Sequence, residues 1–265
     1  MCRDRQRGVL AIFTNNHSFN KGHYHLLLVM PSPILDSAHI WDDCVSRSGA
    51  LNMAIDQILF EQHSETPILR FYIWKTPTIS FGYFQSLKAT QEYFPEKGLE
   101  FIRRWTGGGS VDHRIDLTYT LIIPSTHHLA NLRGAQSYHT IHQAVANALT
   151  RSGVSCSLTD SSHSVKSDAT PCFNRPVEYD IIDARGKKLA GAGQKRSKQG
   201  LLHQGSVIGI LDSNMWKSEF IRQLTLSAIT WSPEVSFDSE VSFEKAAREL
   251  AIKRYASTAW TAKRP

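Results

Sequence analysis

EFIRRWTGGGSVDHRIDLTYTLIIP, residues 100–124, is the stretch of sequence that decides the fold. Residues 100–105 and 117–123 are rich in aromatic and β-branched side chains, which predicts two β-strands. Pro124 ends the second strand because proline has no N–H to donate to a ladder. The three glycines between the strands let the backbone turn sharply and approach a ligand closely. A flexible loop without a ligand is the alternative at this point, because the run matches neither GxGxxG nor a P-loop.

The rest of the chain predicts an α+β fold. Apolar residues at helical spacing predict helices at residues 51–62, 136–151, 215–226 and 243–256. Strand composition and flanking turn residues predict strands at residues 68–74, 78–83, 178–182, 188–194 and 201–210. Because strands outnumber helices and several can pair with a neighbour in the sequence, we expect a mixed, largely antiparallel sheet flanked by helices.

Composition narrows the function classes. The 265 residues are 41% hydrophobic, which is enough for one sizeable core. The formal net charge of +6 comes without long Lys/Arg blocks, which argues against nucleic acid and favours either an acidic protein partner or simple solubility. The sequence contains no run of eighteen apolar residues, which a membrane helix would need, so we expect a cytoplasmic protein without membrane contact. The four cysteines lack CxxC or zinc-site spacing, which predicts free thiols and no metal site.

Two further motifs carry candidate chemistry. Lys188 precedes a run of small residues on a predicted strand, so a ligand has room beside its ammonium, which can polarise a carbonyl. A solvated lysine beside a hairpin turn is the alternative interpretation. His203 lies in the strand LLHQGS and is a candidate base or orienting group, although a lone strand histidine is more often structural.

Taken together, the blocks RRWTGGGSVDHRIDLTYTLIIP, GKKLAGAGQKR and GLLHQGSV, with GALNMAIDQILFE upstream, resemble the lipoate–protein ligase, octanoyltransferase and biotin ligase superfamily. The resemblance covers roughly residues 40 to 210. It implies a catalytic domain over residues 36–230. The sequences on either side predict a poorly structured extension at residues 1–35 and a short helical appendage at residues 231–265. It also implies that Lys188 contacts the acyl carbonyl. The implied acyl site comprises Arg104, Thr106, Gly107, Gly108, Gly109, His113, Ala190, Gly191, Ala192, Gly193 and His203.

The block PCFNRPVEYD at residues 171–180 resembles the cysteine loop of the octanoyltransferases of Gram-positive type. This resemblance implies that Cys172 is a nucleophile that carries the acyl group as a thioester. The chain after Ile210 is too short for the accessory domain that many ligases of this superfamily carry, which also favours a transferase. The alternative for Cys172 is a buried, unreactive thiol, which is the commonest fate of a free cysteine.

The resemblance therefore implies an octanoyltransferase that moves an octanoyl or lipoyl group from acyl carrier protein to a lysine of a lipoyl-domain protein. The glycine cleavage H protein and a 2-oxoacid dehydrogenase subunit are acceptors of this kind. We expect a monomer that needs no cofactor. An ATP-dependent lipoate–protein ligase, which uses ATP and Mg²⁺, and a non-catalytic protein that binds lipoyl domains remain as alternatives.

Overall fold

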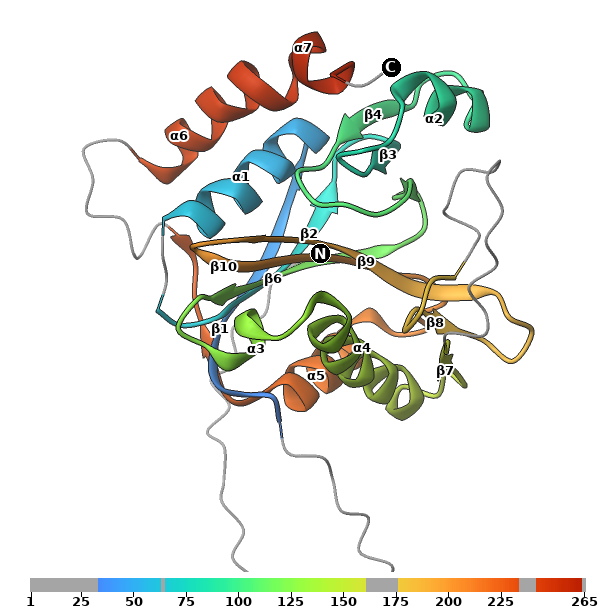
Figure 1. Cartoon of the computed structure of the whole chain (residues 1–265), viewed down its shortest axis with the longest axis vertical. Coiled ribbons are helices and arrows are strands. Elements are labelled where there is room, and N and C mark those ends of the chain that lie inside the picture. The colour runs from blue at the N-terminus through green and yellow to red at the C-terminus, as the bar shows by residue number, and fades with distance from the viewer. Residues whose placement is uncertain (1–32, 63–64, 161–175, 234–241, 264–265) are drawn as a thin grey trace, which may run out of the picture. The chain divides into compact units, whose positions relative to one another are not determined.

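The structure is a computed structural model that describes residues 33–62, 65–160, 176–233 and 242–263. Two sheets form its framework (Figure 1). The larger has eight strands in the order β11-β1-β2-β6-β10-β9-β8-β7, and the smaller has the order β4-β3-β5. The strands of the larger sheet are β1 Leu35–Arg47, β2 Ile68–Trp74, β6 Leu117–Pro124, β7 Ser157–Leu158, β8 Ile181–Ile182, β9 Lys188–Ser197, β10 Gly200–Val207 and β11 Thr225–Thr230. Those of the smaller sheet are β3 Thr78–Phe81, β4 Glu100–Arg103 and β5 Val111–Asp112.

Helices cover both faces of the larger sheet (Figure 1). They are α1 Gly49–Glu61, α2 Leu87–Tyr93, α3 His128–Asn131, α4 Gly134–Arg151, α5 Ser213–Leu224, α6 Phe243–Leu250, the π-helix Ala251–Tyr255 and α7 Thr258–Thr261. Helices α4 and α5 pack on one face, while α1 and α6 pack on the other. Successive residues of β10 alternate between these layers, since Leu201 joins the α4–α5 core and Leu202 the α1 core.

The expected fold class is confirmed. Strand β1 pairs in parallel with β2 and β11, and β3 with β4, whereas the remaining strand pairs are antiparallel. All four expected helices and all the expected strands are present, with ends that differ by a few residues. The longest of the strands that were not expected are β1 and β11. Strand β11 has no sequence signal because it forms an edge of the sheet with nearly all its side chains exposed.

Two expected elements differ in detail. Only Ile181–Ile182 of the strand expected at residues 178–182 is a strand, because Tyr179 has a φ of 68° and turns the backbone out of the extended region. The helix expected at residues 243–256 is α-helical to Leu250 and then widens into a π-helix.

The C-terminal helices pack onto the rest of the structure. Phe243 and Ala247 of α6 lie in the same core cluster as α1, and Tyr255 and Trp260 join a second cluster with it. The boundary expected at residue 231 stays a prediction. The extension expected at residues 1–35 falls outside the described residues except at its end, where Leu35 begins β1. None of the described helices has both the length and the apolar character needed to cross a membrane.

Candidate functional site

One pocket collects most of the residues expected to form the acyl site. It lies between the smaller sheet and the ends of β2, β6, β9 and β10. Its walls are formed by Tyr72, Trp74, Ser80, Arg104, Gly109, Ser110, Val111, His113, Thr118, Lys188, Gly191, Ala192, Gly193, Gln204, Gly205 and Ser206. Residues from six strands and the glycine loop therefore meet at one place, although they are far apart in sequence.

Close backbone contacts shape the glycine loop. A Cβ on Gly82 would lie 2.0 Å from the Gly108 carbonyl oxygen, and a Cβ on Gly193 would lie 2.4 Å from that of Gly107. Neither contact is possible with a side chain, so both neighbours of the loop must be glycine. Gly108 itself has a φ of +93°, a conformation that favours glycine. The loop is thus packed tightly between β3 and β9.

Arg104 holds this loop from inside the pocket. Its guanidinium donates to the Ser80 hydroxyl at 2.7 Å and to the carbonyl oxygens of Gly107 and Gly109 at 3.2 and 2.7 Å. No carboxylate of the described residues pairs with it. Burial lowers the pKa of Arg104 to about 10, so the group stays positively charged at neutral pH. A buried, uncompensated cation makes the pocket favourable for a ligand oxygen that carries negative charge.

His113 continues the network behind Arg104. Its Nδ1 lies 2.8 Å from Oδ2 of Asp116, and its Nε2 lies 2.6 Å from the Ser80 hydroxyl. The Asp116 carboxylate can only accept, which places the imidazole proton on Nδ1 and leaves Nε2 to accept from Ser80. The ring of Trp74 stacks on His113 with centroids 4.0 Å apart. His113 therefore orients Ser80, and Ser80 in turn accepts a hydrogen bond from Arg104.

Lys188 is held by a buried carboxylate. Its Nζ lies 2.7 Å from Oδ2 of Asp180, a side chain with no exposed surface. Asp180 also accepts from the Tyr138 hydroxyl at 2.5 Å and from the backbone N–H of Val177 at 2.8 Å. The stem of Lys188 crosses directly over Gly191. This arrangement fixes the ammonium at the pocket wall.

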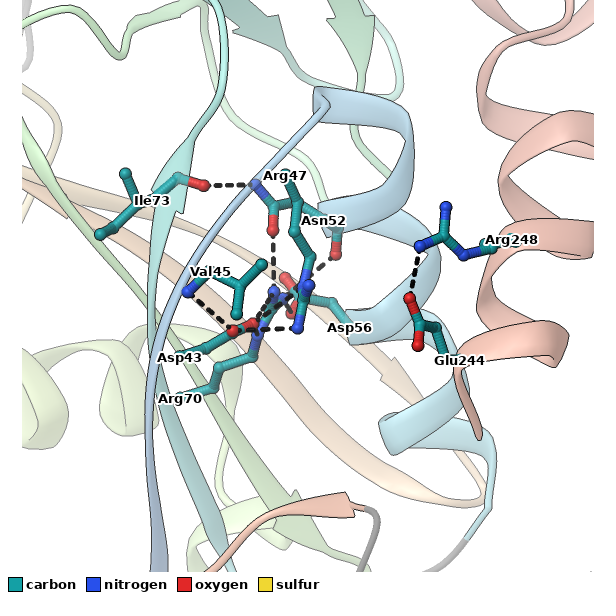
Figure 2. Close-up of polar contacts among 9 residues, drawn as sticks. All are labelled: Asp43, Val45, Arg47, Asn52, Asp56, Arg70, Ile73, Glu244 and Arg248. Carbon is teal, nitrogen blue, oxygen red and sulfur yellow. Dashed lines mark hydrogen bonds and ion pairs between the residues drawn. The ribbon is translucent and has the colours of Figure 1, made fainter. Parts of the chain in front are cut away.

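A second buried ion cluster supports the loop from the α1 side. Figure 2 shows Arg70 between Asp43 and Asp56, with guanidinium-to-carboxylate distances of 2.7 Å to each. The other oxygen of Asp56 accepts from the Gln204 amide at 2.8 Å, and Gln204 accepts from the Thr106 hydroxyl at 2.8 Å. A continuous chain of hydrogen bonds thus runs from Arg70 to the glycine loop.

The structure brings together only part of the expected site. Arg104, Gly109, His113, Lys188, Gly191, Ala192 and Gly193 line the pocket. Gly107 and Gly108 line a separate hollow, on which Ala192 and Gly193 also border. Thr106 is buried behind the pocket against Gln204, and Ala190 is part of the α4–α5 core. Cys172 lies outside the described residues.

His203 points away from the pocket. It is fully buried on the α4 side of β10, where its Nε2 lies 3.1 Å from the Tyr119 hydroxyl and its Nδ1 3.1 Å from the Gln194 amide nitrogen. Burial lowers the pKa of His203 well below its usual value, which keeps it neutral. The next residue, Gln204, occupies the pocket face instead, because successive strand residues point to opposite faces.

Sequence reasoning missed Ser80, Asp180, Tyr138 and Gln204 as members of the site. Strand alternation could have identified Gln204, because it follows His203 on the same strand and therefore points to the opposite face of the sheet. Asp180 was hidden inside an expected strand, although the hairpin turn at residues 184–187 brings it back beside Lys188. Ser80 and Tyr138 carry no local signal, because their roles depend on contacts with distant segments.

Acidic pH should lower the free energy of unfolding, because His142 is buried on the α4 side of the site. His142 donates from Nδ1 to the Tyr179 carbonyl at 2.7 Å, and burial lowers its pKa to about 4. In the unfolded chain the His142 imidazole binds its proton near pH 6.5, whereas in the folded protein it does so only near pH 4. The stabilisation that neutral His142 contributes is therefore complete above pH 6.5 and is lost as the pH falls from 6.5 to 4. We expect a loss of roughly 3 kcal/mol in the free energy of unfolding across that window.

Urea denaturation of the wild type and His142→Asn at pH 7.5 and 5 measures this effect. The asparagine amide can replace the Nδ1 donor but does not titrate. The stability difference between the two proteins should therefore shrink at pH 5. A difference that is the same at both pH values would contradict the assignment.

The comparisons with known proteins agree with this geometry. Residues 48–230 match the family model described as the lipoyl protein ligase A/B catalytic domain. The chain is similar to octanoyltransferase LipM of Anoxybacillus flavithermus, with 35% identity over 65% of this chain and 66% of the relative, just under two thirds of that protein's length.

Solved structures show the same fold. A T. acidophilum protein solved with bound lipoic acid superposes with a TM-score of 0.67 at 19% identity, over 86% of this chain and 100% of that one. Lipoate-protein ligase A bound with ATP superposes with a TM-score of 0.65 at 20% identity, over 85% of this chain and 98% of that one. By its sequence match and its fold, this chain belongs to the lipoyl protein ligase A/B catalytic-domain family.

Proposed function

We propose that the protein is an octanoyltransferase that takes an octanoyl or lipoyl group from acyl carrier protein and passes it to a lysine of a lipoyl-domain protein. The observation that carries this proposal is the pairing of two cations, Arg104 and Lys188, with largely apolar walls in one pocket. An acyl thioester has the matching chemistry, with one polar carbonyl at the end of an apolar chain. The similarity to proteins named octanoyltransferase LipM supports the same activity.

The reaction consists of two acyl transfers. In the first, the Cys172 thiolate attacks the thioester carbon, the carbonyl oxygen becomes negative, and the carrier thiolate leaves. In the second, the acceptor lysine, as a neutral amine, attacks the new thioester and gives one N–H proton to the departing sulfur, so the products are the amide and the Cys172 thiol. The Lys188 ammonium stabilises the negative oxygen in both steps. Neither transfer consumes ATP, so the proposed enzyme needs no cofactor.

The two thiols that the structure describes are less suited to this role. Cys156 lies behind α4, where its sulfur contacts the Ala146 carbonyl, and it does not line the pocket. Burial raises the pKa of the Cys156 thiol, which lowers the thiolate fraction at neutral pH. Cys44 lies on β1 and is exposed. We assign the acyl-carrying role to Cys172 because residues 171–180 resemble the cysteine loop of the octanoyltransferases. We place the enzyme in the cytoplasm, where thiols stay reduced.

Intact-mass analysis after incubation with octanoyl-carrier protein tests this function. The wild type should gain one octanoyl mass that hydroxylamine removes, and peptide mapping should place it on Cys172. Cys172→Ala should gain no mass and should not modify a lipoyl domain, whereas Cys156→Ala should behave as the wild type. Transfer by Cys172→Ala, or modification that requires ATP, Mg²⁺ and free lipoate, would favour a ligase. A wild type that binds lipoyl domains without modifying them would favour a non-catalytic binding protein.

A further inference from the structure

Ser110 has a buried hydroxyl beside the candidate pocket. The residue has no exposed surface, and its Oγ finds no hydrogen-bond partner among the described residues. Buried polar groups in folded proteins are almost always paired, because an unpaired one costs stability. An exception beside a pocket is a candidate for a group that pairs with a ligand.

The backbone holds Ser110 rigidly at the pocket wall. The preceding carbonyl, that of Gly109, accepts from the buried Arg104 guanidinium at 2.7 Å. The following residue, Val111, pairs with Ser80 in the smaller sheet. Ser110 lines the same pocket as Lys188 and Arg104, so it belongs to a fixed part of the pocket wall rather than to a free loop.

We infer that the Ser110 hydroxyl donates a hydrogen bond to the carbonyl oxygen of the bound acyl thioester, which is an inference that rests on the proposed function. When the nucleophile adds to the carbonyl carbon, the C=O double bond becomes a single bond and its electron pair moves to oxygen. The Ser110 proton stays on Oγ and stabilises that charge together with Lys188. When the intermediate collapses, the double bond re-forms and the thiolate leaves. Ser110 forms no covalent bond in either transfer.

This role predicts opposite effects on activity and stability. Ser110→Ala removes a donor that is used most strongly in the transition state, so kcat for octanoyl transfer should fall on the order of 100-fold with KM nearly unchanged. The same change removes an unpaired buried hydroxyl, so the thermal midpoint should stay the same or rise. A purely structural role for Ser110 would instead lower the midpoint along with the activity.

The chain offers a matched control. Ser152 is also buried with an Oγ that has no partner among the described residues, but it caps the C-terminal end of α4 away from the pocket. Ser152→Ala should change the thermal midpoint as Ser110→Ala does and leave kcat at the wild-type value. Ser110→Thr keeps the hydroxyl and should recover most of the lost kcat.

The outcomes separate this inference from the proposed function. If the wild type transfers octanoyl groups and Ser110→Ala does so with an equal kcat, the Ser110 inference is wrong and the proposed function stands. A Ser110→Ala variant whose kcat falls only in proportion to a lowered thermal midpoint also overturns it. If the wild type does not accept octanoyl-carrier protein at all, the proposed function and the Ser110 inference are both wrong.

Discussion

Arg70→Met should lower the free energy of unfolding by about 3–5 kcal/mol, because it strips the counter-charge from two buried carboxylates. The Arg70 guanidinium lies 2.7 Å from Asp43 and 2.7 Å from Asp56, and all three side chains have at most 1% of their surface exposed. It also donates to the Asn52 side chain at 2.8 Å and packs over the ring of Tyr72. Urea denaturation followed by circular dichroism measures the change.

Figure 2 also contains the control for this experiment. Arg248 pairs with Glu244 on the solvent-facing side of α6, with side-chain exposures of 62% and 60%. Exposed pairs of this kind contribute little because water screens the charges, so Arg248→Met should leave the denaturation midpoint nearly unchanged. Equal effects of the two substitutions would mean that the buried cluster contributes no more than a surface pair. Arg70→Met could also lose more activity than its loss of folded protein explains. That result would show that the hydrogen bonds through Asp56 and Gln204 help to hold the glycine loop in place.

Gly191→Ala should lower the transfer rate by roughly 100-fold, which is the scale of losing one donor to the developing oxyanion. A Cβ at this position would lie 2.3 Å from Cε and 2.5 Å from Nζ of Lys188, so the ammonium must move away from its place at the pocket wall. The obstructing atoms are the far end of a flexible side chain, which can move, but the ammonium then leaves the buried Asp180 carboxylate without its counter-charge. The melting temperature should therefore fall as well. Steady-state kinetics with octanoyl-carrier protein and a thermal melt measure the two effects.

Gly134→Ala is the control for Gly191→Ala. A Cβ at residue 134 meets no atom within 4 Å, and the residue begins helix α4, where alanine is favoured over glycine. This variant should keep the wild-type rate and melt at the same or a slightly higher temperature. A Gly191→Ala enzyme with full activity would show that Lys188 is not needed in its observed position.

Local sequence signals were sufficient for the central part of the fold. Strands β2, β6, β9 and β10 and helices α1, α4 and α5 follow from apolar periodicity, because each element buries one face or both. Strand β1 was missed because its sequence, LDSAHIWDDCVSR, mixes charged residues into a strand that is only partly buried. Asp43 is tolerated there only because Arg70 and Arg47 pair with it. That compensation comes from other segments and cannot be read from the strand itself.

The candidate site was predictable to the extent that it lies in contiguous motifs. The glycine loop and the Lys188 strand were identified by their small residues, and both line the pocket. The assignments of Ala190 and His203 to the acyl site stay predictions, since neither residue lines that pocket. Residues such as Ser80 and Tyr138 are positioned by partners 24 or more residues away, so single-sequence patterns do not reveal them.

The pairing of β11 with β1 has a consequence for how the protein is made. Leu35 lies beside Thr225 in the larger sheet, so one edge of that sheet needs residues separated by roughly 190 positions. Arg103, at the end of β4, likewise donates to the carbonyl oxygens of Trp260 and Thr261. The strand that leads into the glycine loop therefore lacks these hydrogen bonds until those residues have left the ribosome exit tunnel. A nascent chain stalled before that point should have a lower transfer rate than the released protein.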